Sequence, residues 1–343
     1  MTDHNCERLT SKIILEIIPT SPFNFDATFH KPDHYPTQDN FWEPGVKWQT
    51  MVWPNFVPPS GGTSRGKPPE KLGLKFINTG STDKPKITVK VYSFLKLDQE
   101  YLNNLKEELI YRYSLSLDLT EFDQKFRDDP QLGPIIKRWK GMRPMHYSSL
   151  YEHIIIMIML QNCTVRRSVS MQQALFEHYG TLLSFDNKKL WAFWEPADLE
   201  IITEEELRGL KIGYRAKFIK RISSQFVNHE VNEFAIRKMS QEEQKEKLLS
   251  LYGIGPASVN DLLWEVFKHY DKLVKISPWQ QKIYSKLFFD RDPENPISED
   301  KLLHFFEEKY GRYQMLAVHY LWEDLWWKRQ NEHIPWLEKL IRL

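Results

Sequence analysis

The hydrophobic pattern of this 343-residue chain changes its period near residue 98. Before that point, Ile87, Val89 and Val91 alternate with polar neighbours as in a half-buried strand. Beyond Leu119 the pattern is helical almost throughout. We expect an α+β fold, with an N-terminal antiparallel β-sheet domain over residues 1–118 followed by an all-α domain over residues 119–343. The predicted strands are residues 12–18, 47–53, 72–78 and 86–95, with a helix at 99–113 packed on the sheet.

Composition limits the classes of protein to which this chain can belong. Net charge is only +1, so any surface for nucleic acid must come from local clustering of basic residues. Cys6 and Cys163 are the only cysteines, which excludes a disulfide framework and cannot supply the four thiolates of an iron–sulfur cluster. The longest apolar run, residues 154–160, is shorter than the ~20 residues of a membrane span, and the polar N-terminus lacks the apolar stretch of a signal peptide. We expect an intracellular monomer, cytoplasmic in a prokaryote.

One glycine-rich segment imitates a nucleotide-binding loop. Residues 61–67 have the spacing of a P-loop, but Pro68 follows where a metal-binding Ser or Thr is required. A second proline, Pro69, also opposes the helix whose N-terminus would hold phosphates. We therefore expect no nucleotide site and interpret residues 54–69 as a mildly basic flap whose role stays open.

A second pair of glycines, Gly253 and Gly255, is more informative about function. Residues 251–263 predict a helix-hairpin-helix, near 240–265, with Gly253, Ile254 and Gly255 in the turn and Pro256 in the first turn of the next helix. Such a turn points backbone N–H groups and a helix N-terminus at one spot, which suits a DNA phosphate. Because glycine also caps ordinary helices, a purely structural interaction module stays an alternative.

Three further stretches accompany the hairpin. They are residues 160–162, 207–218 and 310–317. Together the four stretches, over residues 119–327, resemble the helix-hairpin-helix DNA glycosylase superfamily, in its 8-oxoguanine and alkylpurine branch. The resemblance implies a protein that binds double-stranded DNA, extrudes a nucleotide, fills the gap and cleaves the base from the sugar.

The resemblance also implies roles for particular residues. Asn162 would fill the gap, and Arg167, Tyr214 and Arg215 would contact the partner base or wedge beside it. Trp279 would pack against the hairpin or DNA. The basic cluster that would meet phosphates comprises Arg208, Lys211, Arg215, Lys217, Lys220 and Arg221. Arg167 and Arg215 could instead be ordinary solvated helix arginines.

The chain departs from this branch at the catalytic position. Relatives carry a motif of the form Val-Asp-x-His, whose Asp stabilises the sugar cation or activates water. Here the matching residues 276–279 place Ser277 at the Asp position, so the helix-starting role is kept and the charge is lost. The position of the Schiff-base lysine in bifunctional members is Ala257, so we expect no strand cleavage.

A replacement carboxylate can be sought on the helix that leaves the hairpin. Asp261 falls where relatives place a residue facing the flipped base, and Glu265 lies on the same face by i,i+4 spacing. If both were buried, one pKa should rise, which suits acid–base catalysis. The alternative is two solvated carboxylates, with Glu265 beside Lys268. The candidate catalytic residues are thus Asp261, Glu265 and Ser277, and the candidate base pocket is Asp261, Val318 and Trp322, with Trp322 stacking on the extruded base.

Two DNA-binding functions remain beside the structural module. The first is a monofunctional DNA N-glycosylase, and the alternative is a catalytically inactive, base-sensing descendant. The substrate alternatives are an oxidised or alkylated purine, or a hypermodified cytosine as in phage DNA. No metal-ligand spacing is present among the histidines. We expect no cofactor, and leave open a monovalent or divalent cation at the hairpin phosphate site.

Overall fold

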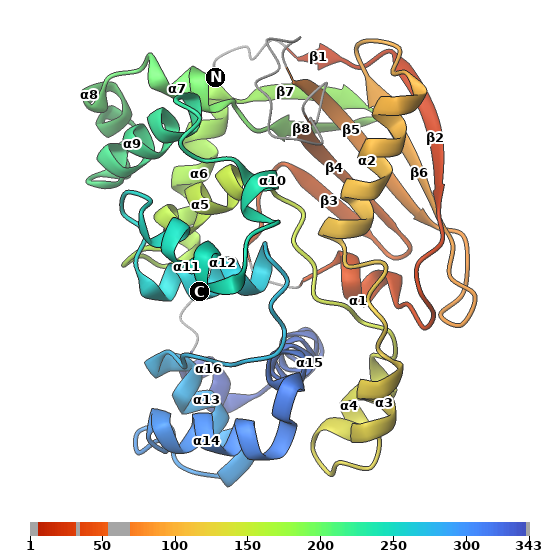
Figure 1. Cartoon of the computed structure of the whole chain (residues 1–343), viewed down its shortest axis with the longest axis vertical. Coiled ribbons are helices and arrows are strands. Elements are labelled where there is room, and N and C mark those ends of the chain that lie inside the picture. Colours follow the sequence, from red (N-terminus) through yellow and green to blue (C-terminus); the bar gives the residue numbers. More distant parts are fainter. Residues whose placement is uncertain (1–5, 32–34, 54–68, 341–343) are drawn as a thin grey trace.

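The computed structural model describes residues 6–31, 35–53 and 69–340 (Figure 1). The imitation P-loop at residues 61–67 and the flap around it lie outside these ranges. None of the helices within the described ranges has the length and apolar character required to cross a membrane.

The N-terminal part forms a five-stranded antiparallel sheet. Its strands are β2 (Ser11–Ile17), β3 (Asn40–Glu43), β4 (Val46–Trp53), β5 (Glu70–Asn78) and β6 (Ile87–Ser93), in the spatial order β2-β6-β5-β4-β3. The short helix α1 (Phe25–Phe29) and the longer α2 (Gln99–Arg112) accompany it, and α2 lies across the sheet. Alternate strand residues such as Leu72, Leu74 and Phe76 are fully buried because one face packs against α2. The predicted strands and helix are confirmed to within a few residues.

A second, three-stranded sheet corrects the expectation that the part after residue 119 is all helical. It contains β1 (Glu7–Arg8), β7 (Thr181–Phe185) and β8 (Lys188–Ala192), in the order β1-β7-β8. The turn residues Asp186 and Asn187 both have positive φ, 47° and 61°, as a two-residue hairpin of this type requires. The carboxylate of Asp186 accepts hydrogen bonds from Trp48 Nε1, Lys75 Nζ and Tyr92 Oη at 2.7–2.9 Å. The hairpin is thereby fastened to the five-stranded sheet.

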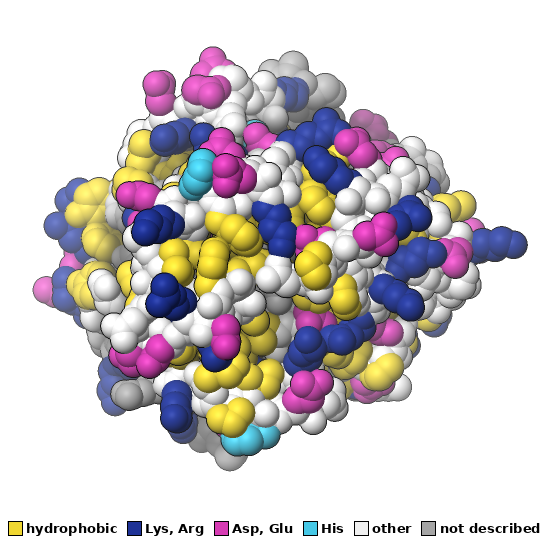
Figure 2. Space-filling view, turned by 90° about the horizontal axis from the view of Figure 1, so that it is seen from below, with side chains coloured by type: hydrophobic (Ala, Val, Ile, Leu, Met, Phe, Trp, Pro, Cys, Tyr) yellow, Lys and Arg dark blue, Asp and Glu magenta, His cyan; other side chains and the backbone are white. Residues whose placement is uncertain are grey.

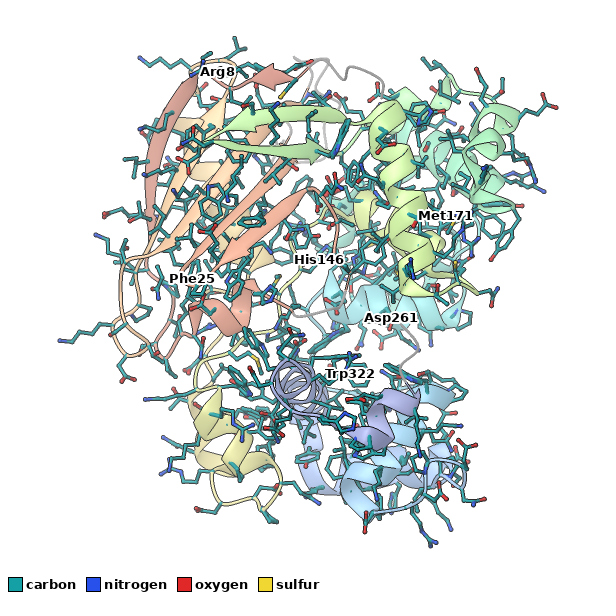
Figure 3. The ribbon with its side chains drawn as sticks, turned by 180° about the vertical axis from the view of Figure 1, so that it is seen from behind. Arg8, Phe25, His146, Met171, Asp261 and Trp322 are labelled. Carbon is teal, nitrogen blue, oxygen red and sulfur yellow. The ribbon has the colours of Figure 1, made fainter. Side chains whose placement is uncertain are left out.

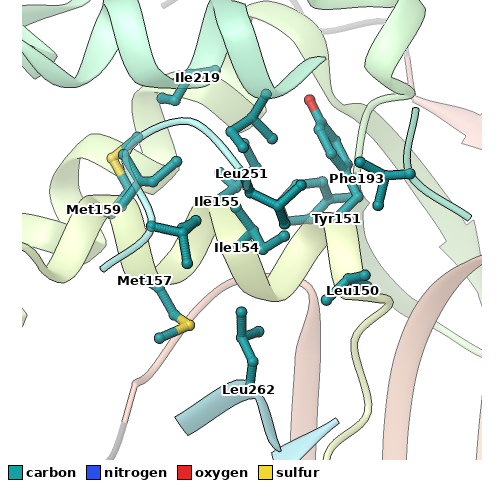
Figure 4. Close-up of a cluster of buried hydrophobic side chains, with 14 of the residues drawn as sticks. Leu150, Tyr151, Ile154, Ile155, Met157, Met159, Phe193, Ile219, Leu251 and Leu262 are labelled. Carbon is teal, nitrogen blue, oxygen red and sulfur yellow. The ribbon is translucent and has the colours of Figure 1, made fainter. Parts of the chain in front are cut away.

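The helices form two groups. The upper helical group consists of α5 (Leu150–Leu160), α6 (Val165–Tyr179), α7 (Pro196–Glu200), α8 (Glu204–Leu207), the π-helical turn η1 (Arg208–Ile212), α9 (Arg215–Val227), α10 (Glu233–Ile236), α11 (Gln241–Leu249) and α12 (Pro256–Glu265). Its core surrounds α5, whose residues Ile154 and Ile155 are fully buried; Leu251 and Leu262 bring the hairpin and α12 onto this core (Figure 4). The hairpin is therefore held by hydrophobic packing and not by its glycines alone.

The lower helical group combines segments that are distant in sequence. It consists of α3 (Thr120–Phe126), α4 (Leu132–Arg138), α13 (Pro278–Phe289), α14 (Glu299–Tyr310), the 3₁₀ turn η2 (Gly311–Tyr313), α15 (Gln314–Arg329) and α16 (Pro335–Leu340). Phe122, Phe126, Tyr284, Phe306 and Tyr320 share its core. The chain thus crosses to the upper group through residues 139–149 and returns through residues 266–277 (Figure 1).

Candidate active site and DNA-binding face

A cavity of about 660 Å³ lies where the two helical groups meet the five-stranded sheet. One side, here called the helical wall, is formed by α12, α13 and α15 and includes Asp261, Glu265, Tyr284, Val318, Trp322 and Glu323. The other side, here called the sheet wall, comes from β3, β4, the connection between α1 and β3, and the crossing segment 139–149, and includes Lys31, Thr37, Asn40, Trp42, Lys47 and Tyr147. The three members of the predicted base pocket all line this cavity.

Asp261 and Glu265 are presented by one face of α12. The helix begins at Gly255, its N-cap, and Pro256 occupies its first turn. Figure 3 shows Asp261 on the side of α12 that faces the lower helical group, with Trp322 across from it. The i,i+4 spacing therefore places both carboxylates in the cavity.

Both carboxyl groups resist ionisation. Asp261 is exposed, yet desolvation by the protein atoms around its carboxyl group raises its pKa to about 6. Burial raises the pKa of Glu265 to about 7; the cation of Lys268 opposes this rise, and the neighbouring charges of Asp261 and Glu323 add to it. Both groups thus titrate near neutrality, and Glu265 titrates together with Lys268, whose pKa is lowered by burial to about 7.

Across from Asp261, the helical wall has an aromatic and apolar surface formed by Trp322 and Val318. Val318 is 7% exposed, and Trp322 is half-buried. The Trp322 ring is held edge-on by Trp279, at 5.2 Å between ring centroids, and by Tyr284, at 6.4 Å. An indole that is fixed at its edges and lines a cavity is suited to stack on a planar base.

Sequence reasoning missed two lysines in the cavity. Lys31 Nζ donates to the Ala27 carbonyl at 3.1 Å and lies 3.7 Å from the Glu323 carboxylate, and burial lowers its pKa. Lys47 Nζ donates to the Phe29 carbonyl at 2.9 Å, and burial lowers its pKa to about 8. No local motif announces these residues, because only the tertiary fold brings them to α12.

The hairpin turn is accessible and shaped by its glycines. Gly253 has φ +81°, and a Cβ there would lie 2.9 Å from the Phe218 ring. A Cβ on Gly255 would meet nothing within 4 Å, so the backbone at the start of α12 is open. Ile254, 6% exposed, anchors the turn in the upper core. An open helix N-terminus of this kind is suited to bind an anion.

Two of the predicted DNA contacts, Asn162 and Tyr214, lie beside this turn. Asn162 is exposed, has φ 48°, and its Nδ2 lies 3.5 Å from Tyr214 Oη. Tyr214 is 42% exposed. Gln161, next to Asn162, donates from Nε2 to the Gly253 carbonyl at 3.0 Å, which joins this turn to the hairpin. Arg167 is exposed and donates to the Lys211 carbonyl at 2.7 Å.

Arg215 does not lie where we expected. It is 7% exposed, and its guanidinium donates to the carbonyls of Ile158, at 3.1 Å, and Gln161. The expectation that it belongs to an exposed basic surface is therefore wrong. Because its donors satisfy carbonyls at the end of α5, Arg215 fixes the turn that carries Asn162.

Ser277 and Trp279 also differ in their surroundings from the predicted catalytic and DNA-contacting roles. Ser277 caps α13, its Oγ accepting from Gln280 N at 3.3 Å, and it does not line the cavity. Trp279 packs in the lower helical group, where its Nε1 donates to the Leu340 carbonyl at 3.2 Å. Their visible contributions are to start α13 and to hold Trp322.

The basic cluster is only partly free for phosphate. Arg208 pairs with Glu204 at 2.6 Å, and Lys220 donates to the Glu200 carbonyl. Lys217 and Arg221 remain beside Tyr252, with their cations 5.9 and 4.2 Å from its ring centroid. On the face formed by the lower helical group, by contrast, acidic and basic side chains are interspersed (Figure 2). Within the described ranges, no group of three or more His, Cys, Asp or Glu side chains is arranged to hold a metal ion.

Comparisons with known proteins agree on the fold. No family model matches the sequence. The chain is 23% identical over 172 residues to a DNA-3-methyladenine glycosylase of Bacillus subtilis, covering 48% of this chain and 57% of that relative, so the match spans only about half of the relative's length. It is 22% identical over 226 residues to a probable N-glycosylase/DNA lyase of Methanothermobacter thermautotrophicus, covering 60% of this chain and 70% of the relative.

Among solved structures, the 3-methyladenine DNA glycosylase of Archaeoglobus fulgidus matches with a TM-score of 0.70 at 16% identity, covering 93% of this chain and 100% of that one. The chain has the fold of the helix-hairpin-helix DNA glycosylases, and the resemblance predicted from its four motifs is confirmed.

Proposed function

We propose that this protein is a monofunctional DNA N-glycosylase that acts as a monomer on double-stranded DNA, extrudes one modified nucleotide into the cavity and hydrolyses its N-glycosidic bond. The observation that carries the proposal is the pair Asp261 and Glu265, which face a cavity across from Trp322 on the helix that starts at the open hairpin. Base excision requires these parts together: a grip on the backbone, a stacking surface and an acid–base pair.

Asp261 supplies the negative charge. With a pKa of about 6 it is mostly ionised at neutral pH, so its carboxylate can stabilise the cationic sugar that forms when the base leaves with the bonding electrons. A water then adds to the anomeric carbon, and Asp261 accepts its proton. This assigns to α12 the task that relatives give to the residue at the Ser277 position.

Glu265 is the second participant. Since its pKa is about 7, a substantial fraction carries a proton at neutral pH and can donate it to the departing base. Two carboxyl groups on one helix face would thereby divide the work, with one ionised and the other protonated.

We expect no strand cleavage because no lysine stands where bifunctional relatives form a Schiff base with the sugar. Ala257 stands at the position of the Schiff-base lysine of bifunctional relatives. Lys31 and Lys47 do line the cavity, but neither stands at that position of α12. We therefore expect borohydride to trap no covalent protein–DNA adduct, and heating in alkali to be needed before the abasic product breaks.

The alternative, a base-sensing descendant without activity, is favoured only by the structural role of Ser277. The decisive experiment incubates the protein with duplexes carrying alkylated, oxidised and phage-type modified bases and detects abasic sites. Asp261→Asn should lower single-turnover release by roughly 10²-fold or more while DNA affinity stays nearly unchanged. The exposed Asp271→Asn is the matched control. Equal turnover by Asp261→Asn and wild type would remove Asp261 from the mechanism.

A further inference from the structure

The cavity is larger than the chemistry at Asp261 requires. Its volume of about 660 Å³ lies within the ~300–1,000 Å³ of sites that enclose drug-sized ligands. A flipped nucleobase is a single planar ring system, and Asp261, Val318 and Trp322 of the helical wall already offer it a charged edge and a stacking surface. The sheet wall is left without an occupant in this arrangement.

We propose that the cavity accepts a base bearing a bulky, uncharged, hydroxyl-rich substituent, with the ring against the helical wall and the substituent against the sheet wall. This inference rests on the proposed function, because it places a flipped base beside Asp261. The sheet wall then determines which bases are excised.

The two walls belong to one continuous site. Asp261, Glu265, Lys31 and Lys47 all line the cavity. Lys31 joins the two walls, because its Nζ lies 3.7 Å from the carboxylate of Glu323 on the helical wall. A substituent that extends from a base beside Asp261 toward the sheet wall therefore enters the part of the cavity that Lys31 and Lys47 line.

The sheet wall offers the groups that bind hydroxyls. Lys47 extends its ammonium toward the Tyr147 ring, 5.0 Å from the centroid, and uses one donor on Phe29; a lysine ammonium has three. Asn40 Nδ2 donates to the Asp39 carboxylate at 2.8 Å and to the phenol oxygen of the same tyrosine at 3.4 Å, so a ligand hydroxyl would bind this amide in place of the longer of these contacts. Amine and amide donors around an aromatic ring can bind a polyhydroxylated group through both its hydroxyls and its apolar C–H faces.

Aromatic surface is also fixed in place here. Trp42 stacks on His30, at 4.1 Å between ring centroids and 5° between planes, and its Nε1 donates to Asp26 Oδ1 at 3.1 Å. A ring held at both its face and its edge loses little entropy when a ligand packs against it.

Charge favours a neutral substituent over an anionic one. Lys31 lies 3.7 Å from the Glu323 carboxylate, and Asp39 is close enough to raise the pKa of Lys47 against the effect of burial. The two cations are thus compensated by carboxylates from α15 and from the segment before β3. A phosphate or carboxylate substituent would enter a site with no excess positive charge.

The test uses three duplexes that differ only at carbon 5 of one cytosine, which carries hydrogen, a hydroxymethyl group or a glucosylated hydroxymethyl group. Single-turnover release of the glucosylated base should exceed that of the hydroxymethylated base by at least about tenfold, the value of one or two well-placed hydrogen bonds. Equal release from the three duplexes, or exclusion of the glucosylated base alone, would overturn the inference.

Substitutions in the sheet wall test its role in substrate choice separately from the role of the helical wall in catalysis. Asn40→Ala and Lys47→Met should each reduce the ratio of glucosylated to hydroxymethylated release roughly tenfold, whereas the exposed Asn295→Ala is the control. An unchanged ratio in both variants overturns the inference even if the glucosylated base is released. Circular dichroism verifies that each variant is folded.

Failure of the proposed function has a different signature. It would show as no base release from any duplex, with alkylated and oxidised ones included. Duplex affinity then decides the inference independently: tighter binding of the glucosylated duplex, weakened by Asn40→Ala, supports the sheet-wall pocket, and equal binding of all three duplexes overturns it.

Discussion

The two walls of the cavity differ in how their charged groups are supplied. The helical wall takes its two proposed catalytic carboxylates, Asp261 and Glu265, from α12, whereas the sheet wall takes its amines from separate segments, Lys31 after α1 and Lys47 in β4. Gly255 and Asp261 are six residues apart on one helix, or ~9 Å along its axis. The proposed contact with the DNA backbone and the proposed chemistry thus share one helix, while the residues of the sheet wall come from segments that are separate from it.

The largest expected effect tests whether the helical wall alone performs the chemistry. Release should rise with pH as Asp261 ionises near pH 6 and fall as Glu265 loses its proton near pH 7, giving a narrow optimum between these values. Glu265→Gln should lower the rate roughly 10²-fold at the optimum and flatten the alkaline limb. The charges that face Glu265 are Lys268, Asp261, Glu323 and Lys31, so the titration is that of a network.

Single-turnover rates from pH 5 to 9 check this prediction. An alkaline limb that persists unchanged in Glu265→Gln would assign that limb to another group, and the division of labour on α12 would be wrong.

A prediction of intermediate size separates DNA binding by the hairpin from the rate of base release. Gly253→Ala introduces a side chain at φ +81° and 2.9 Å from the Phe218 ring, a strain of about 1–3 kcal/mol. We expect it to weaken DNA affinity about tenfold while the rate at saturating DNA changes less. Gly45→Ala, at φ +78° but with nothing within 4 Å of its Cβ, is the matched control.

Titration of fluorescent duplex with both variants measures this effect. If Gly45→Ala weakens binding as much as Gly253→Ala does, general destabilisation and not the hairpin explains the loss.

The difference between the two walls also explains which residues could be predicted from the sequence. The hairpin and four of the five strands of the sheet follow from local patterns, namely glycines in a turn and alternation along strands. The resemblance to the glycosylases placed Asp261 in the pocket, and i,i+4 spacing placed Glu265 beside it. Lys31 and Lys47 could not be found this way, because each reaches the cavity only through tertiary packing. Arg215 failed for a related reason, since a basic residue at the start of a helix looks the same in sequence whether it faces solvent or caps the carbonyls of a neighbouring helix.

The smallest expected effect concerns stability. Because the folded protein holds the pKa of Asp261 at about 6, above its ordinary 3.8, the folded state binds this proton more tightly than the unfolded state does. The associated stabilisation is complete below about pH 4 and is lost as pH rises through 6. Asparagine does not ionise, so Asp261→Asn should raise the thermal midpoint at pH 8 relative to wild type, by on the order of 1–3 °C for a solvent-accessible group, and change it little at pH 4. Thermal melts at both values, with Asp271→Asn as control, measure the difference. A higher thermal midpoint of Asp261→Asn at pH 8, together with loss of base release, would mean that the helical wall keeps a destabilising carboxylate because its chemistry requires it. An equal change of the midpoint at both pH values would instead show that altered packing causes the change.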